Sequence, residues 1–134
     1  MTKKKILIAT GGTGGHIFPA LALAKNLIKK NYDVRLTTDP RGLKYLGDKN
    51  EINFTKIPSS PLISKNIFTV VRSMILICYS LLKSLFLLCL IRPNIILGMG
   101  GYSSFPICIA AKILRIKFVI YENNLIIGKA NKYL

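Results

Sequence analysis

The chain has 134 residues, of which 51% are hydrophobic and 19% charged, so it is long enough for one domain with a real core and too apolar for intrinsic disorder. Twenty Lys and Arg residues against five Asp and Glu give a net charge of +15, which favours anionic partners such as lipid headgroups or phosphorylated substrates. The basic residues are scattered without interleaved aromatic residues, which argues against nucleic acid as a partner, although compositional drift explains the charge equally well.

The first half of the chain alternates short apolar runs with helical patterns. The apolar run at residues 6–9 predicts a buried parallel strand that ends at a glycine cluster. A helix is predicted from about Ile17, because apolar residues then recur at three- and four-residue spacing. Beyond this helix we expect strands at residues 34–38 and 52–57, with a short helix at residues 41–48 between them.

The second half continues the alternation. A long apolar helix is predicted at residues 66–91, and Pro93 prevents its continuation. We then expect a strand, a helix and a strand at residues 94–97, 104–114 and 117–121. Strands that alternate with helices across short turns predict an α/β fold, a Rossmann-like parallel sheet with helices on both faces. A helical pattern without a capping signal at residues 132–134 favours a truncated chain or one half of a split protein.

The long helix carries one charged residue, Lys83, between Ser73 and Ile91. Its hydropathy permits a transmembrane span, but one crossing would place the two glycine clusters of the chain on opposite sides of the membrane. Polar residues recur at helical spacing as a narrow stripe, Arg72-Ser73, Tyr79-Ser80 and Lys83-Ser84. We therefore predict one face packed on the core and another in peripheral contact with an anionic membrane surface. A partner domain that covers the outer face is the alternative.

Two glycine clusters follow predicted strands and precede predicted helices. The first reads Gly11-Gly12-Thr13-Gly14-Gly15-His16 and the second reads Gly98-Met99-Gly100-Gly101-Tyr102. Both would lie at the carboxyl edge of a parallel sheet, where backbone N–H groups and helix N-termini bind anionic ligands. The first cluster fits neither the P-loop nor the GxGxxG pattern, although Asp39 after the next strand would suit a dinucleotide-binding module. The alternative is that the glycines only allow tight turns.

Two side chains near these clusters are candidate general bases. His16 is the single histidine, and the positive end of the following helix disfavours its protonated form, which leaves an imidazole able to accept a proton. Glu122 follows the last predicted strand at the same edge of the sheet. A histidine that only hydrogen-bonds its loop, and a carboxylate that is only solvated, are the plainer interpretations.

The sequence indicates neither a metal site nor a disulfide framework. Its three cysteines, Cys78, Cys89 and Cys108, are odd in number and widely spaced, and no CxxC pair or histidine cluster accompanies them. Carboxylates are not gathered either, so we expect no metal and no cofactor. A reducing, cytosolic compartment follows from the same cysteine usage.

These motifs together resemble those of one enzyme family. The chain is similar to the MurG family in the first glycine cluster continued to Ala20, in the second cluster with Pro106, and in Glu122-Asn123-Asn124 with Gly128 and Asn131. Members of this family are UDP-N-acetylglucosamine:undecaprenyl-diphospho-muramoylpentapeptide N-acetylglucosaminyltransferases of peptidoglycan synthesis. The resemblance spans nearly the whole chain. It implies that residues 1–134 form the N-terminal, acceptor- and membrane-binding half of a two-domain GT-B glycosyltransferase, without the C-terminal donor domain.

The resemblance also implies an inverting reaction. A sugar hydroxyl of the lipid-linked acceptor, lipid I, attacks the anomeric carbon of UDP-N-acetylglucosamine, UDP departs and lipid II forms, at the cytoplasmic face of the inner membrane. One general base is needed, and we favour His16 over Glu122. The implied donor contacts from this half are Thr13, Gly14, Gly15 and Asn124. The implied loops for the acceptor diphosphate contain Gly11, Gly12, Gly100, Gly101 and Tyr102.

Two alternatives stay open. One is the membrane-recruiting half of a split lipid-linked N-acetylglucosaminyltransferase, whose catalytic half is a separate chain. The other is a dinucleotide-binding module that uses Asp39, and binding of NAD without dependence on a UDP-sugar would favour it. If the chain is a glycosyltransferase half, we expect it to be inactive alone, because the donor domain is missing.

Overall fold

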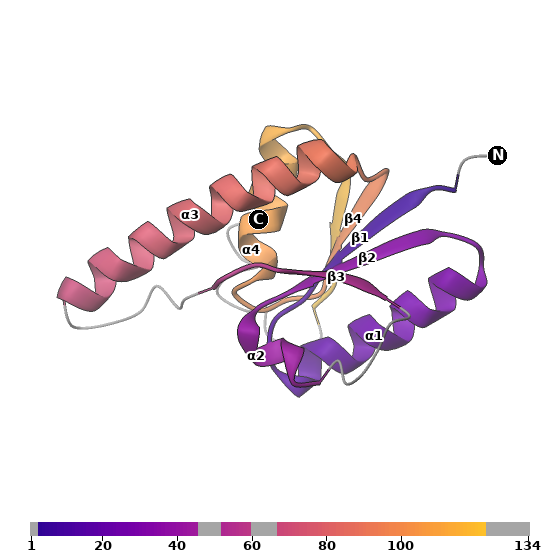
Figure 1. Ribbon diagram of the computed structural model, residues 1–134, viewed down its shortest axis with the longest axis horizontal. Coiled ribbons are helices and arrows are strands. Elements are labelled where there is room, and N and C mark those ends of the chain that lie inside the picture. Colours follow the sequence, from indigo (N-terminus) through magenta and orange to yellow (C-terminus); the bar gives the residue numbers. More distant parts are fainter. Residues whose placement is uncertain (1–2, 46–51, 60–66, 123–134) are drawn as a thin grey trace.

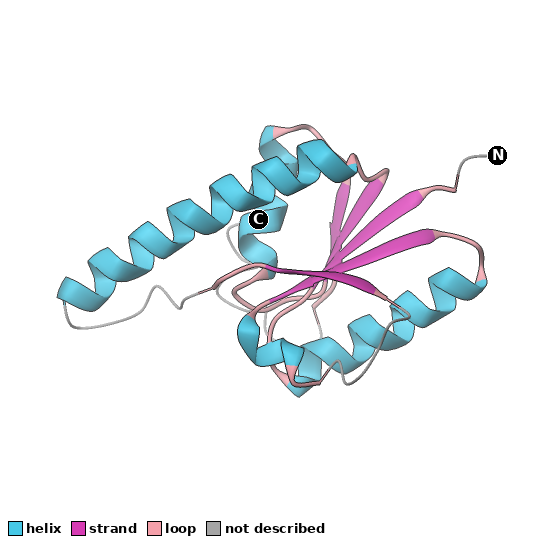
Figure 2. Cartoon of the chain, in the orientation of Figure 1, coloured by secondary structure: helices cyan, strands magenta, loops and turns pink. Residues whose placement is uncertain are grey.

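The computed structural model describes residues 3–45, 52–59 and 67–122, and within them strands and helices alternate strictly (Figures 1 and 2). The strands are β1 (Lys5–Ala9), β2 (Asp33–Thr38), β3 (Asn53–Lys56), β4 (Ile95–Gly98) and β5 (Phe118–Ile120). The helices are α1 (Gly14–Lys29), α2 (Pro40–Leu43), α3 (Ile67–Ile91) and α4 (Ser104–Ile113).

All strand pairs are parallel, and the sheet has the order β3-β2-β1-β4-β5. The central strand β1 pairs with β2 on one side and with β4 on the other, so that Ile6 lies opposite Val34 and Ile95. The chain builds outward from β1 to β3 and then returns through α3 to β4. This reversal between β1 and β4 is where ligands bind in open parallel sheets. The predicted α/β fold with a parallel sheet is confirmed.

Helices cover both faces of the sheet, with α1 and α2 on one and α3 and α4 on the other (Figure 1). The sequence of β1 explains both layers, because successive side chains of a strand point to opposite faces. Ile6 and Ile8 join the core cluster of α1, whereas Leu7 and Ala9 join the cluster beneath α3 and α4. A run of consecutive apolar residues is therefore buried on both sides, as predicted for residues 6–9.

Two helices begin or end away from their predicted positions. α1 begins at Gly14, three residues before the predicted Ile17, so the last two glycines of the first cluster form its first turn. α2 begins at Pro40 because the Asp39 carboxylate accepts hydrogen bonds from the backbone N–H groups of Arg41 (2.9 Å) and Gly42 (3.2 Å). The predicted end of α2, at residues 46–48, and the helical pattern at residues 132–134 lie outside the described residues.

α3 buries three serines against the rest of the protein, while many of its large apolar side chains are exposed. Ser73, Ser80 and Ser84 are buried, and the hydroxyl of Ser84 donates to the carbonyl oxygen of Ser80 (2.6 Å). The predicted polar stripe is therefore divided: its serines face the protein, where their small size lets helix and loop approach closely. Solvent instead meets a row of large side chains: Ile67, Phe68, Val71, Met74, Ile75, Tyr79, Leu82, Phe86 and Leu90.

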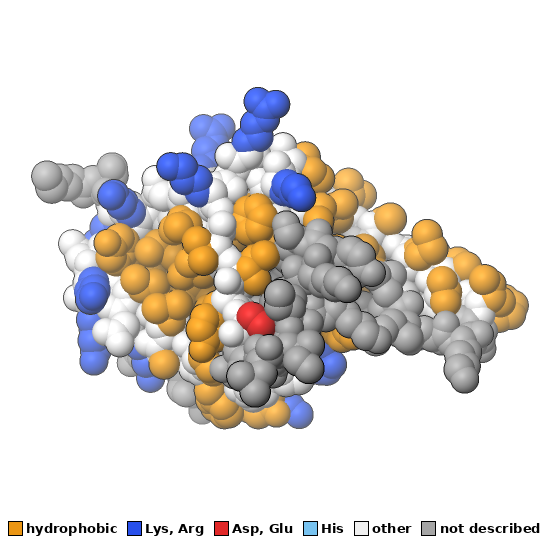
Figure 3. Space-filling model, turned by 180° about the vertical axis from the view of Figure 1, so that it is seen from behind, with side chains coloured by type: hydrophobic (Ala, Val, Ile, Leu, Met, Phe, Trp, Pro, Cys, Tyr) orange, Lys and Arg blue, Asp and Glu red, His pale blue; other side chains and the backbone are white. Residues whose placement is uncertain are grey.

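The first half of α3 extends beyond the sheet as an arm, covered mainly by hydrophobic side chains, while Lys and Arg side chains gather on other parts of the surface (Figures 1 and 3). The large apolar residues of α3 that are buried in the core, Leu87, Leu88 and Ile91, lie in its last turns, and Leu81 and Leu85 pack against the same cluster partly buried. Within the described residues, α3 is the one helix long and apolar enough to cross a membrane by length and composition. Both a core face and an exposed apolar face are thus present, as predicted.

Candidate functional site

The two glycine clusters meet at the carboxyl edge of the sheet, in the loop after β1 (residues 10–13, the first glycine loop) and the loop after β4 (residues 99–103, the second glycine loop). The Gly11 N–H donates to the carbonyl oxygen of Gly100 (2.8 Å). The Ser103 hydroxyl donates to the carbonyl oxygen of Thr10 (2.6 Å). Because β1 and β4 are neighbours, two sequence segments almost ninety residues apart form one surface.

Some of these glycines are required by packing. Gly100 and Gly101 have φ angles of +85° and +84°, which side chains rarely tolerate. A Cβ atom on Gly11 would lie 2.7 Å from the Cα of Gly101, so the two loops touch backbone to backbone. The N–H of Gly11 is also used within the protein. Gly11 therefore joins the two loops, and its place in a loop for the acceptor diphosphate stays a prediction.

The remaining glycines of the first cluster differ in the space around them. A Cβ atom on Gly15 would meet nothing within 4 Å, and one on Gly14 would lie 3.2 Å from the ring of Phe18. Gly12 differs, because a Cβ atom there would overlap the carboxylate of Asp39 and lie 2.7 Å from the Cβ of Arg41. The absence of a side chain at Gly12 thus makes room for Asp39 and Arg41, whereas the space beside Gly15 is open.

The N-termini of α1 and α4 point to this same edge. Thr13 and Ser103 occupy the N-cap positions, neither side chain caps its own helix, and neither first turn contains an acidic residue. The positive end of each helix dipole is therefore not neutralised by the side chains of its own helix. Two such ends beside one another favour a negatively charged ligand such as a diphosphate.

His16 lies where the two loops join. It is in the first turn of α1, and its ring packs against the second loop, since a Cβ atom on Gly100 would lie 2.9 Å from its Cε1 and 3.0 Å from its Nδ1. Nδ1 is buried and has no hydrogen-bond partner among the described residues. The predicted base and both predicted loops are thus brought together.

The remaining predicted site residues divide between the described and undescribed parts. Glu122 is half-buried and follows β5, and the N–H of neighbouring Tyr121 donates to the carbonyl oxygen of Gly98 (2.7 Å) at the start of the second loop. Tyr102 is half-buried in that loop and Thr13 is exposed. Asn124 lies outside the described residues. In residues 3–45, 52–59 and 67–122, no three His, Cys, Asp or Glu side chains gather together.

Asp39 does not have the environment of a ribose-binding carboxylate. Its side chain is 1% exposed; one oxygen caps α2, and the other accepts hydrogen bonds from Arg41 Nη2 (2.6 Å) and Ser59 Oγ (2.9 Å). Burial acts to raise the pKa of Asp39, but the hydrogen bonds from Arg41 and Ser59 outweigh it and hold the pKa below its usual value. A buried, fully bonded carboxylate has no oxygen left for a ribose, which removes the basis of the dinucleotide-binding alternative.

Sequence reasoning missed Arg41 at this edge. The sequence signal was present, since Asp39 followed by Pro40 is the pattern of a helix N-cap with proline at the first helical position. That pattern would have placed Arg41 in the first turn of a helix at the carboxyl end of β2. Its approach to Gly12 depends on the pairing of β1 with β2, which the local pattern does not contain.

Comparison with known proteins decides the family. Residues 6–134 match the model of the glycosyltransferase family 28 N-terminal domain. The chain belongs to glycosyltransferase family 28. The resemblance inferred from the glycine motifs is thereby confirmed, and so is the Rossmann-like half of a GT-B fold.

Relatives in family 28 give the same result. The chain is 40% identical over 97% of its length to a Pelagibacter ubique protein, and 41% identical over 98% of its length to a Protochlamydia amoebophila protein. Both are named UDP-N-acetylglucosamine--N-acetylmuramyl-(pentapeptide) pyrophosphoryl-undecaprenol N-acetylglucosamine transferase. The crystal structure of Acinetobacter baumannii MurG matches 97% of the chain with a TM-score of 0.81 and 28% identity. The chain spans 36%, 35% and 38% of the lengths of these three proteins.

The two classes of glycine predict opposite mutational results. Gly11→Ala is expected to destabilise the fold by about 1–3 kcal/mol, because the new methyl group must displace the backbone of Gly101. Gly15→Ala is expected to leave the free energy of unfolding unchanged or raised by up to about 1 kcal/mol, because alanine is the better helix former and has open space. Urea denaturation of both variants measures this difference. Equal stability of the two variants would contradict the packing role of Gly11.

Proposed function

We propose that the chain is the acceptor-binding half of an inverting glycosyltransferase that transfers N-acetylglucosamine from UDP-N-acetylglucosamine to undecaprenyl-diphospho-muramoylpentapeptide. The observation that carries this proposal is the pair of joined glycine loops, with two helix N-termini at the switch point and His16 between them. The names of the family relatives support the choice of substrates. The donor domain is expected on a further stretch of chain or a separate one.

The reaction needs one proton acceptor. A hydroxyl oxygen of the acceptor sugar forms the new bond to the anomeric carbon as the bond from that carbon to the UDP oxygen breaks, which inverts the configuration. The hydroxyl proton passes to His16, and Glu122 is the second candidate for this role. His16 Nδ1 is buried against Gly100, so Nε2 is the nitrogen assigned to the proton.

The negative charge of the diphosphate groups is stabilised by backbone N–H groups and by the N-termini of helices. The N-termini of α1 and α4 face the diphosphate-bearing ligands and supply positive potential that is already oriented before binding. Thr13, Gly14 and Gly15 are proposed as donor contacts at the start of α1, where the open space at Gly15 lets a donor sugar-nucleotide approach. Asn124 is proposed as a further donor contact.

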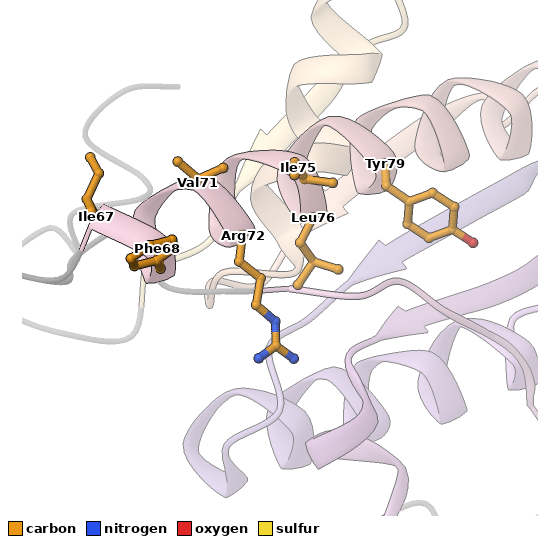
Figure 4. A pocket seen from close by; sticks show the side chains of 7 residues that line it. All are labelled: Ile67, Phe68, Val71, Arg72, Ile75, Leu76 and Tyr79. Carbon is orange, nitrogen blue, oxygen red and sulfur yellow. The ribbon is translucent and has the colours of Figure 1, made fainter.

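α3 is proposed to hold the protein peripherally on the cytoplasmic face of the inner membrane, near the lipid-linked acceptor. α3 exposes Phe68, Ile75, Leu82 and Phe86, each by 66% or more, and the net charge of +15 attracts anionic lipid. A groove of about 630 Å³ runs along the arm, where Arg72 projects beside apolar side chains (Figure 4). Apolar side chains around one cation suit lipid tails near a phosphate headgroup.

A fusion experiment tests the proposed activity. The chain is joined to the C-terminal domain of the Pelagibacter relative, and transfer of labelled N-acetylglucosamine to the lipid-linked acceptor is followed. We expect acceptor-dependent transfer by the fusion and none by the 134-residue chain alone, because a donor bound by one half lacks most nucleotide contacts. Transfer by the chain alone would contradict the two-domain proposal. A folded fusion that binds UDP-N-acetylglucosamine but never transfers it to this acceptor would contradict the proposed substrate.

A further inference from the structure

Arg41 is a surface arginine whose position is fixed by a buried carboxylate. Its Nη2 and Nε atoms lie 2.6 Å and 3.2 Å from Oδ2 of Asp39. The Asp39 side chain is 1% exposed, whereas that of Arg41 is 55% exposed. An exposed arginine normally loses side-chain entropy when it binds a ligand, but here Asp39 has already imposed much of that ordering.

The same arginine stands beside the first glycine loop. Its Cβ would lie 2.7 Å from a Cβ atom on Gly12, so the side chain starts in contact with the first loop. The hydrogen bonds that Arg41 donates to the Asp39 carboxylate are the main cause that raises the pKa of Arg41. Because the hydrogen bond from Gly11 to Gly100 joins the second loop to the first, Arg41 lies at the edge of the sheet where both loops meet.

The guanidinium of Arg41 has N–H groups that no described residue accepts. It carries five N–H groups, of which Asp39 accepts two, and the described residues provide no acceptor for the other three. Capping of α2 does not require the guanidinium, because the Asp39 carboxylate caps through the backbone N–H groups of Arg41 and Gly42. Planar N–H pairs of this kind bind phosphate oxygens in a bidentate manner.

We propose that Arg41 binds a phosphate of the acceptor diphosphate, with Asp39 as a positioning residue that holds the guanidinium at the mouth of the glycine loops. The identity of the diphosphate as the acceptor's rests on the proposed function, whereas the diphosphate site itself does not. Ser59 supports the arrangement, because its hydroxyl donates to the Asp39 oxygen that Arg41 contacts (2.9 Å) and so ties the segment after β3 to the site.

Titration of the 134-residue chain with inorganic pyrophosphate at low salt tests the site without any transfer reaction. We expect Arg41→Gln to weaken pyrophosphate binding by at least about tenfold, since a charge-assisted pair of hydrogen bonds is lost. Arg41→Lys keeps the charge but not the planar fork, and is expected to weaken binding by several-fold. Lys29→Gln is the matched control, because it removes one charge at the far end of α1, and it should change the affinity less than about twofold.

Asp39→Asn separates position from charge. It leaves the guanidinium charged but removes the ion pair that holds it, so the affinity is expected to fall between those of wild type and Arg41→Gln. Thermal melting of each variant shows whether it is folded at the temperature of the titration. If Arg41→Gln does not fold, the comparison of Arg41→Lys with Lys29→Gln decides the outcome.

The results separate this proposal from the proposed function. No pyrophosphate binding by the wild-type chain, or equal affinities of the Arg41 variants and Lys29→Gln, would overturn the role of Arg41. If the fusion enzyme transfers sugar and Arg41→Gln raises neither its KM for the acceptor nor the dissociation constant for pyrophosphate, Arg41 is excluded and the proposed function stands. If the fusion never transfers sugar but pyrophosphate binding depends on Arg41, the diphosphate site stands and the proposed function fails.

Discussion

Replacement of His16 by alanine is expected to lower kcat of the fusion enzyme by about 100-fold or more, with little change in KM for the acceptor. The imidazole is the proposed proton acceptor, and its ring lies between the first turn of α1 and Gly100, where the two loops join. Loss of a general base raises the barrier of the chemical step alone, because substrate binding depends on the loops and helix ends. Steady-state kinetics with both substrates varied measures the two parameters.

Glu122→Gln is the companion variant, since it removes the other candidate base while conserving size. We expect Glu122→Gln to retain more of kcat than His16→Ala. The reason is that His16 lies where the two loops join, whereas Glu122 lies farther along the edge, after β5. A larger kcat loss in Glu122→Gln would reassign the base to Glu122. If His16→Ala keeps kcat and only raises KM for the acceptor, His16 is a binding residue.

The double variant Leu82→Ser/Phe86→Ser is expected to weaken binding of the chain to anionic vesicles by about 100-fold or more. These two side chains are 66% and 72% exposed, so their replacement removes little packing from the folded chain. Transfer of each side chain from water into lipid contributes about 1.5–3 kcal/mol. Vesicle co-sedimentation measures the partition coefficient of the variant against wild type.

Phe54→Ser is the matched control, because Phe54 is a 50% exposed aromatic residue on β3 rather than α3, and it should bind vesicles like wild type. The native cysteines add a direct readout. Cys78 and Cys89 of α3 are exposed, whereas burial raises the pKa of Cys108 to about 12 and keeps its thiol protonated. A thiol-reactive dye is therefore expected to label α3, and anionic vesicles should protect it.

Varying the lipid composition of the vesicles and the salt concentration shows whether electrostatic attraction or apolar contact attaches the chain to the membrane. Added salt should weaken a charge-led attachment, since electrostatic attraction is screened over about 8 Å at physiological ionic strength. Equal binding to neutral and anionic vesicles would show that the apolar face acts without the net charge. Attachment that survives alkaline carbonate would instead indicate a transmembrane span. If the folded chain binds neither lipid and its α3 cysteines stay unprotected, a protein partner covers the helix.

The sheet could be predicted because its signals are local. Short segments rich in apolar residues, such as residues 6–9 before the first glycine cluster and residues 52–57 before Pro58, located the strands. β4 differs from its predicted range by one residue at each end. The start of α1 could not be predicted, because glycine is a poor helix former and the first turn is held by the surrounding loops. The burial of the α3 serines could not be predicted from the sequence either, because hydropathy favours burial of leucine and phenylalanine over serine.

The site was predicted in its parts but not in its contacts. The placement of His16 and the two glycine clusters at one edge followed from the parallel sheet, because all of its strands end at the same edge. That β1 and β4 are neighbours, which brings the two loops into contact, is shown only by the structure. The different surroundings of Gly11, Gly12 and Gly15 could not be predicted from the sequence, because a motif presents all three as the same residue. Which glycine faces protein and which faces open space depends on atoms supplied by other strands.

The backbone contact between Gly11 and Gly101 has a consequence for how such sequences diverge. Neither position accepts a side chain while the other keeps its backbone in place, and no compensating change exists, because both already carry the smallest residue. A descendant that lost its chemistry but kept its sheet would retain this pair, whereas a Cβ atom at position 15 would meet no atom within 4 Å. The pair Gly11 and Gly101 is therefore expected to report on an intact edge of the sheet rather than on activity.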